Sequence, residues 1–145
     1  MSGDQMYHAS SVLIDGRAVL LAGASGQGKS DLALRLIYRG ALLISDDYTM
    51  LVHRNGTLYA SPPVNIAGLL EIRGVGIVNM AFAAEGPVAL ILDLDVGPPR
   101  LPDDILPTTR LYGVDIPTLG FSALETSAAI KAEQALLRYG LGVTS

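Results

Sequence analysis

The sequence contains no cysteine, which excludes disulfide bonds, thiolate metal sites and cysteine nucleophiles and is compatible with a reducing compartment. Basic residues are few: ten, scattered along the chain, against fourteen acidic ones, so nucleic-acid binding is disfavoured. No apolar run approaches the roughly 20 residues of a membrane span, and the N-terminus lacks the charged-then-apolar order of a signal peptide. We therefore expect a soluble, cytoplasmic protein.

The length of 145 residues and the 50% hydrophobic content suit one domain with a substantial core. We expect residues 1–145 to form a single α/β domain. Its sheet should be mixed and partly antiparallel, because Asp15-Gly16 and Asn55-Gly56, two dipeptides typical of tight hairpin turns, separate strand-like runs. One helix should follow the first hairpin and a second should lie near the C-terminus, both packed against the sheet.

Residues 23–30 fit the pattern G-x-x-x-x-G-K-[ST] of a phosphate-binding P-loop. A strand-like run, residues 18–22, precedes the motif, and residues 31–38, with apolar positions at helical spacing, follow it. In this context backbone N–H groups cradle phosphate oxygens, the lysine reaches the β- and γ-phosphates, and the serine hydroxyl is offered to Mg²⁺. A turn without a ligand would not require lysine and serine here. The predicted nucleotide-binding residues are Gly23, Ala24, Ser25, Gly26, Gln27, Gly28, Lys29 and Ser30.

Further along the chain, Gly40 is expected to end the first helix in a left-handed conformation. Residues 97–107 contain four prolines and predict a surface loop. Ser122 and Glu125 form a potential capping box, which predicts a final helix over residues 123–139 that stops at Gly140. Further strands are expected at residues 41–45, 48–53, 57–60 and 88–92.

Two consecutive carboxylates are the first candidates for the chemistry. Asp46 and Asp47 end a short apolar run, where paired carboxylates suit Mg²⁺ binding through water and proton abstraction from an attacking hydroxyl. In the alternative interpretation Asp46 only caps a turn. Asp93, which ends a buried strand-like run of the Walker B kind, is a rival acid for the metal that the residues alone do not rank below Asp46.

Two other positions are weaker candidates. Glu71 and Arg73 lie two residues apart in an apolar run, so in a strand they would share a face and meet one phosphate–metal cluster. A simple salt bridge between them is equally compatible with the spacing. His8, a lone histidine near the N-terminus, carries little signal of its own.

Taken together, these motifs resemble the catalytic domain of HPr kinase/phosphorylase. The resemblance rests on His8, the P-loop, the sequence Leu-Ile-Ser-Asp-Asp at residues 43–47 and the sequence Leu-Glu-Ile-Arg-Gly-Val-Gly-Ile-Val-Asn at residues 70–79. The Glu-Ile-Arg-Gly-x-Gly-Ile stretch is the specific part, because P-loops are shared by many families. The resemblance covers residues 8–79 well and thins out beyond them.

The resemblance implies a bacterial serine protein kinase that phosphorylates HPr, the phosphocarrier of the sugar phosphotransferase system, with ATP or pyrophosphate, and that can reverse the reaction. It implies that Lys29 contacts the β/γ-phosphates and that Ser30 and Glu71 serve Mg²⁺. Asp47 would accept the proton of the substrate serine, with Asp46 beside it, and would donate a proton in reverse. His8 becomes an active-site member, Arg73 belongs to the signature, and Arg100 is a weak match to an arginine near the transferred phosphoryl group.

The sequence departs from the family pattern in two places. Family members generally carry a separate N-terminal domain before the histidine, whereas this chain begins seven residues before it, so we expect a naturally minimal kinase domain or an excised one. The family's Pro-Val-x-x-Gly-Arg-Asn loop has no counterpart in residues 116–122. The short form resembles versions that act on an HPr-like regulatory protein, and the family is commonly hexameric.

Three other functions compete with the serine kinase. A nucleotide-sensing module that has lost phosphotransfer is motivated by the missing C-terminal loop. A switch GTPase is disfavoured, because there is no Asn-Lys-x-Asp motif to read guanine. A nucleoside or small-metabolite kinase is compatible with the P-loop alone, although no arginine-rich lid is visible.

Overall fold

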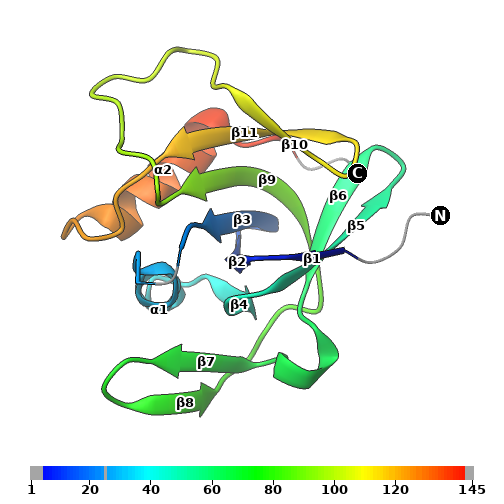
Figure 1. Ribbon diagram of the computed structural model, residues 1–145, viewed down its shortest axis with the longest axis vertical. Coiled ribbons are helices and arrows are strands. Elements are labelled where there is room, and N and C mark those ends of the chain that lie inside the picture. The colour runs from blue at the N-terminus through cyan, green and yellow to red at the C-terminus, as the bar shows by residue number, and fades with distance from the viewer. Residues whose placement is uncertain (1–4, 25, 143–145) are drawn as a thin grey trace.

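The computed structural model describes residues 5–24 and 26–142, and its elements confirm the α/β prediction (Figure 1). Within these residues there are eleven strands, two α-helices and one 3₁₀ turn. In chain order they are β1 Gln5–Tyr7, β2 Ala9–Ile14, β3 Arg17–Ala22, α1 Lys29–Tyr38, β4 Leu42–Ser45, β5 Thr49–Arg54, β6 Thr57–Ser61, η1 Val64–Ile66, β7 Leu69–Ile72, β8 Gly76–Asn79, β9 Gly86–Asp93, β10 Thr108–Leu111, β11 Val114–Gly120 and α2 Ala128–Tyr139.

Nine of the strands form one mixed sheet. Seven of them follow the order β1-β5-β6-β9-β3-β2-β4, and β11 also pairs with β9 and carries β10. The pairs β3–β9 and β9–β11 are parallel, whereas β2 runs antiparallel to both β3 and β4. The carboxyl ends of β3, β9 and β11 therefore open at one edge of the sheet, which is where ligands bind in open α/β sheets.

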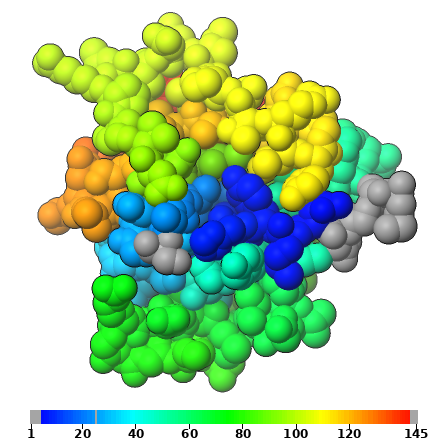
Figure 2. Space-filling model, viewed as in Figure 1, coloured from blue at the N-terminus to red at the C-terminus, as the bar shows by residue number. Residues whose placement is uncertain are grey.

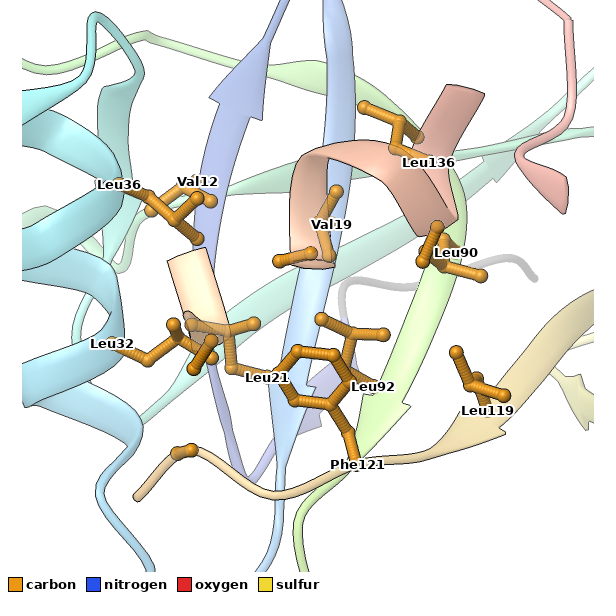
Figure 3. Close-up of a cluster of buried hydrophobic side chains, with 14 of the residues drawn as sticks. Val12, Val19, Leu21, Leu32, Leu36, Leu90, Leu92, Leu119, Phe121 and Leu136 are labelled. Carbon is orange, nitrogen blue, oxygen red and sulfur yellow. The ribbon is translucent and has the colours of Figure 1, made fainter. Parts of the chain in front are cut away.

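Both helices cover one face of this sheet. Side chains alternate across a strand, so Val19 and Leu21 of β3 face the helices while Leu20 faces the other way. Figure 3 shows Leu32 and Leu36 of α1 directed toward the sheet residues around Leu21. All of these leucines are fully buried. Burial of this apolar face holds α1, and with it the P-loop, against the sheet.

A second core lies on the other face of the sheet. Leu20, Ile44, Leu51, Leu58 and Ile116 are all buried in it, and they come from five different strands. The strands β3 and β9 are therefore buried on both faces. This explains why their sequences are nearly continuous apolar runs without polar alternation.

Tight hairpin turns explain the antiparallel part of the sheet. The two predicted turns adopt positive φ at both central residues, with φ values of 49° and 79° at Asp15 and Gly16 and of 51° and 82° at Asn55 and Gly56. A third turn of this kind, at Tyr112-Gly113 between β10 and β11, was not predicted because tyrosine is an uncommon residue at positive φ.

The hairpin β7–β8 forms a separate two-stranded sheet. It packs against α1 through β7, and Leu70 at the centre of β7 is fully buried. In Figure 1 the hairpin lies beside α1 and apart from the main sheet. Its outer strand exposes Ile77, and Val75 in its turn is also exposed.

The structure overturns two details of the sequence prediction. Helix α2 begins at Ala128 and not at residue 123, and no side-chain cap bond is made at its N-cap, Ser127. The predicted capping box of Ser122 and Glu125 is therefore wrong: the backbone there is held by other contacts, described below. Arg73 lies in the turn after β7, so it does not share a strand face with Glu71.

Candidate active site

The predicted P-loop joins the end of β3 to the start of α1. Gly28 is the N-cap residue of α1 with φ of 91°, and a Cβ atom there would lie 3.2 Å from the Cβ of Ala123. Gly23 has φ of 146°, and its Cβ would lie 3.3 Å from a carboxylate oxygen of Asp95. Both positions therefore require glycine on conformational and steric grounds. Ser25, one of the predicted nucleotide-binding residues, lies outside the described residues.

Lys29 is the first residue of α1 and is only 6% exposed. Its ammonium group donates a hydrogen bond of 2.6 Å to the carbonyl oxygen of Gly23. The Lys29 side chain thus reaches from the end of the P-loop back to the first residue of the P-loop, Gly23. A single cation lies beside the backbone amides of the loop, as phosphate binding requires.

Asp46 is the centre of a polar cluster at the end of β4. Its Oδ1 accepts hydrogen bonds from the hydroxyl of Ser30 at 2.6 Å and from that of Ser10 at 3.1 Å, and its Oδ2 accepts the backbone N–H of Glu71 at 3.1 Å. The residue is 9% exposed. Three segments that are distant in the sequence, the P-loop helix, β2 and β7, therefore meet on one carboxylate.

Asp47 points to a different partner although it is the next residue. Its φ of 68° is left-handed, its N–H donates to Ser10 Oγ at 3.0 Å, and its Oδ1 lies 3.0 Å from Nε2 of His8. The His8 ring is stacked on Tyr48, with 4.9 Å between ring centroids. The side chains of His8 and Asp47 are 42% and 53% exposed. Asp47 is thus an oriented carboxylate that remains open to a substrate.

Two acids at the end of β9, Asp93 and Asp95, lie on the other side of the P-loop. Asp95 accepts the backbone N–H of Ala24 through both carboxylate oxygens, at 3.0 and 3.1 Å. Asp93 accepts the N–H of Asp95 at 3.0 Å. The Ser30 hydroxyl contacts Asp46, which favours Asp46 over Asp93 as the acid on the magnesium side. The sequence analysis did not predict a role for Asp95. The pattern that could have indicated one is a second acid two residues after the acid that ends a Walker B-like strand.

The remaining predicted site residues are placed at the periphery. Glu71 reaches the cluster through its backbone, while its side chain is exposed. Arg73 is exposed in the β7–β8 turn, and Arg100 is exposed in the loop between β9 and β10, where it lines a pocket with Phe121 and Ser122. In Figure 2 the light-blue P-loop region lies between the green β7–β8 hairpin and the yellow-green loop after β9.

One titratable group beside the site has a shifted pKa. Burial raises the pKa of the Tyr7 phenol, and the nearby carboxylate of Asp93 and the phenol of Tyr112 raise it further. Tyr7 therefore stays protonated at neutral pH, and its phenol lies near Asp93, the last residue of β9.

The oxygen donors around Asp46 suit a magnesium ion, which needs only a few protein ligands. In the part of the chain that the structure describes, they do not form a metal site built from protein ligands alone. The Ser30 hydroxyl and the Asp46 carboxylate are hard oxygen donors that already converge on each other. Within the described residues no three His, Cys, Asp or Glu side chains form a metal-binding group. Mg²⁺ suits such a sparse site, because it keeps several waters and is usually bound by one or two carboxylates together with substrate phosphates.

Comparison with known protein families gives one matching family model, the HPr Serine kinase C-terminal domain, over residues 1–84. This range includes the P-loop, both aspartates of the Asp46 cluster and the β7–β8 hairpin. Among the helices that the structure describes, none is long and apolar enough to cross a membrane.

Individual relatives agree with the family model. An HPr kinase/phosphorylase of Chlorobium phaeobacteroides (strain BS1) is 36% identical over 129 residues, which are 79% of this chain and 38% of that protein. One from Clostridium botulinum (strain Eklund 17B / Type B) is 44% identical over 80 residues, 55% of this chain and 26% of the relative. The chain thus spans well under half the length of these relatives.

A solved structure shares the fold over nearly the whole chain. The Hpr(Ser) kinase/phosphatase from Coxiella burnetii superposes with a TM-score of 0.79 at 30% identity, and the alignment covers 92% of this chain and 94% of that one. The similarity therefore extends past residue 84 into the region where the sequence resemblance thins out.

Proposed function

Because the chain belongs to the family of the HPr serine kinase C-terminal domain, we propose that it is an ATP-dependent serine protein kinase acting on HPr or an HPr-like phosphocarrier of the phosphotransferase system. The same site would run the reaction in reverse as a phosphorylase. The observation that carries the proposal is the hydrogen-bonded path from Ser30 through Asp46, Ser10 and Asp47 to His8. It joins a phosphate-binding loop to an accessible carboxylate.

At the phosphate end, the chain's own groups supply positive charge and donors. The backbone amides of residues 23–30, the start of α1 and the Lys29 ammonium would bind the β- and γ-phosphates of ATP, or pyrophosphate in its place. Ser30, Asp46 and Glu71 would hold Mg²⁺. When bound, that ion neutralises charge on the phosphate oxygens.

At the acceptor end, Asp47 would act as the general base. The hydroxyl of the substrate serine passes its proton to Asp47 while its oxygen attacks the γ-phosphorus, and the bond from that phosphorus to the bridging oxygen of ADP breaks. The hydrogen bond from His8 orients the carboxylate for this transfer. In the reverse direction Asp47 returns the proton to the departing serine oxygen. Arg73 remains proposed as a cation near the reacting groups, whereas Arg100 lines the pocket beside Phe121 and would face the nucleotide from the side opposite Asp46.

The test is a phosphotransfer assay with Mg²⁺, labelled ATP and the HPr-like protein of the source organism. We expect label on a partner serine, lost in Lys29→Ala and in Asp47→Asn. Arg110→Ala, which removes an exposed cation in β10, is the control and should retain activity. Nucleotide binding without labelling of any HPr-like partner would contradict the kinase proposal.

That contradictory outcome would favour the alternative function, a nucleotide-sensing module. It is supported by one observation: residues 116–122, which lack the family's arginine and asparagine, form the end of β11 and the segment after it. Phosphoserine on a partner that disappears in Asp47→Asn would exclude this alternative.

The proposed setting follows from the proposed substrate. We propose that the chain acts in the cytoplasm with residues 1–145 as one catalytic domain, and assembly into a hexamer is proposed from the family resemblance alone. Light scattering of the purified protein measures that assembly. A monomer would contradict the hexamer without affecting the proposed chemistry.

A further inference from the structure

A pocket of about 360 Å³ lies between the loop that follows β9 and the segment that follows β11. Its apolar lining comes from buried Leu119 and Phe121 and from exposed Pro98 and Pro99. Its polar lining comes from the Ser122 hydroxyl and from the exposed side chains of Arg100, Glu125 and Lys131. A concave site that combines an apolar base with convergent polar groups suits a small molecule that has both an apolar face and polar edges.

The backbone builds this pocket rigidly. The N–H of Phe121 donates to the carbonyl oxygens of Asp93 and Val96, both at 3.0 Å, so the segments after β9 and β11 are bonded to each other. A Cβ at Gly120 would lie only 2.8 Å from the carbonyl oxygen of Gly97. The two segments thus cross at a distance that only glycine allows, and this crossing fixes the base of the cavity.

The same segment also borders the P-loop. Ala123, two residues after Phe121, is the group that a Cβ on Gly28 would meet at 3.2 Å. Arg35 of α1 donates hydrogen bonds to the carbonyl oxygens of Ala123 and Glu125. Ser122 lines the pocket and the next residue, Ala123, lies against the P-loop. The segment that forms the pocket is also hydrogen-bonded to α1, the helix that follows the P-loop.

The strand order indicates in which direction a bound nucleotide would lie. Ser30 and Asp46, which mark the metal-binding end, lie toward β4 on one side of β3. The pocket lies on the other side, against the segments that follow β9 and β11. Figure 1 shows the ends of these two strands on the side of β3 away from β4. A triphosphate whose γ-phosphate lies at Ser30 would then direct its nucleoside away from β4, toward this pocket.

We propose that this pocket binds the base and ribose of the nucleotide whose phosphates the P-loop holds, an inference that rests on the proposed function. The face of the base packs on Phe121 and the prolines. The Ser122 hydroxyl and the Glu125–Lys131 ion pair, 2.5 Å between Nζ and Oε1, supply hydrogen-bonding groups at the rim for the ribose and the base edge.

Calorimetry with two phosphate ligands isolates the contribution of the base. Mg-ATP and Mg-tripolyphosphate offer the P-loop the same phosphates, but only ATP has a nucleoside. We expect ATP to bind about tenfold more tightly than tripolyphosphate, because stacking one base on an aromatic side chain contributes about that factor in affinity. Ser122→Phe, which fills the pocket, should abolish this preference and leave tripolyphosphate affinity within about twofold. Thr108→Phe, at an exposed position in β10, should preserve the preference.

Photolabelling with 8-azido-ATP provides a second measurement on the unaltered chain. Labelled peptides should contain residues 98–102 or 119–125, and Mg-tripolyphosphate should compete. Labelling confined to other segments, or equal affinity of the wild type for the two ligands, would overturn the pocket inference while leaving the phosphate site of the proposed function intact. Failure of both ligands to bind would overturn the inference and the proposed function together.

Discussion

Ser10 is the residue that links the two aspartates. It is fully buried, donates to the Asp46 carboxylate and accepts the backbone N–H of Asp47, whose left-handed φ is held by this contact. Under the kinase proposal Ser10 is a positioning residue: it relates the metal-binding carboxylate to the carboxylate that takes the proton. Small displacements of such groups are costly in phosphoryl transfer.

We predict that Ser10→Ala lowers kcat roughly tenfold with little change in the KM for ATP, because a buried hydrogen-bonding group loses its partner. Ser10→Thr keeps the hydroxyl and should restore most of kcat. The matched control is Ser11→Ala, since Ser11 is equally buried but bonds to Thr49 at 2.8 Å, away from the aspartates. Equal losses of kcat in the two alanine variants would show that Ser10 is merely structural.

Tyr7 makes stability depend on alkaline pH. Its pKa is raised in the folded protein, mainly by burial, so the folded state binds this proton more tightly than the unfolded chain does. Stability is therefore unaffected below the ordinary tyrosine pKa of about 10. It falls as the pH rises from there through the folded-state pKa.

We expect Tyr7→Phe to flatten this alkaline fall. The measurement is the urea midpoint of unfolding at a series of pH values from neutral to strongly alkaline. Tyr38→Phe is the control, because Tyr38 is 91% exposed. If Tyr7→Phe and the wild type lost stability in parallel, another group would be responsible for the dependence.

At the scale of elements, helix α2 has two adjacent leucines that differ in burial. Leu136 is 1% exposed in the helix-side core, whereas the adjacent Leu137 is 66% exposed. We predict that Leu136→Ala destabilises the protein by about 2–5 kcal/mol, through lost burial and a residual cavity, and that Leu137→Ala costs less than about 0.5 kcal/mol. Chemical denaturation of both variants measures the difference, and similar losses would contradict this helix register.

Local patterns predicted most elements but not all of their boundaries. The strand and the helix on either side of the predicted P-loop, and the two hairpins with glycine at the turn, depend on neighbouring residues and were confirmed. The predicted start of α2 was wrong because tertiary contacts occupy the carbonyl groups that would accept the first helical hydrogen bonds. The carbonyls of Ala123 and Glu125 are bonded to Arg35, a residue about ninety positions earlier. No window of local sequence contains that information.

The site illustrates the same limit. Asp46 was predicted from its position at a strand end, but the sequence could not show that it, and not Asp93, meets the hydroxyl of Ser30. Nor could the spacing show that Asp95 binds the amide of Ala24, since these residues lie 71 positions apart. Each distinction depends on which strands are neighbours, and strand order follows from long-range pairing that local patterns do not record.

At the scale of the whole molecule, one strand joins the parts. The start of β9 pairs with β6 and its end with β11, while β3 lies along it as a parallel neighbour. The two hydrophobic cores are on opposite faces of β3 and β9. The P-loop follows β3, and Asp95 follows β9, so the proposed phosphate site adjoins two strands that are buried on both faces. Ligand binding there should be coupled to global unfolding.

We therefore predict that Mg-ATP at about one hundred times its Kd stabilises the protein by about 2.7 kcal/mol. For a chain of this size that corresponds to a Tm increase of roughly 5–10 °C. Lys29→Ala should lose most of the increase, because the buried ammonium is the cation beside the phosphate loop. Each variant is compared with and without ligand, so a change in its own Tm does not affect the result.

Arg110→Ala is the control and should keep the full increase in Tm. Retention of the increase in Lys29→Ala would mean that ATP binds elsewhere on the molecule, because a phosphate cradle without its lysine cannot hold the triphosphate with unchanged affinity.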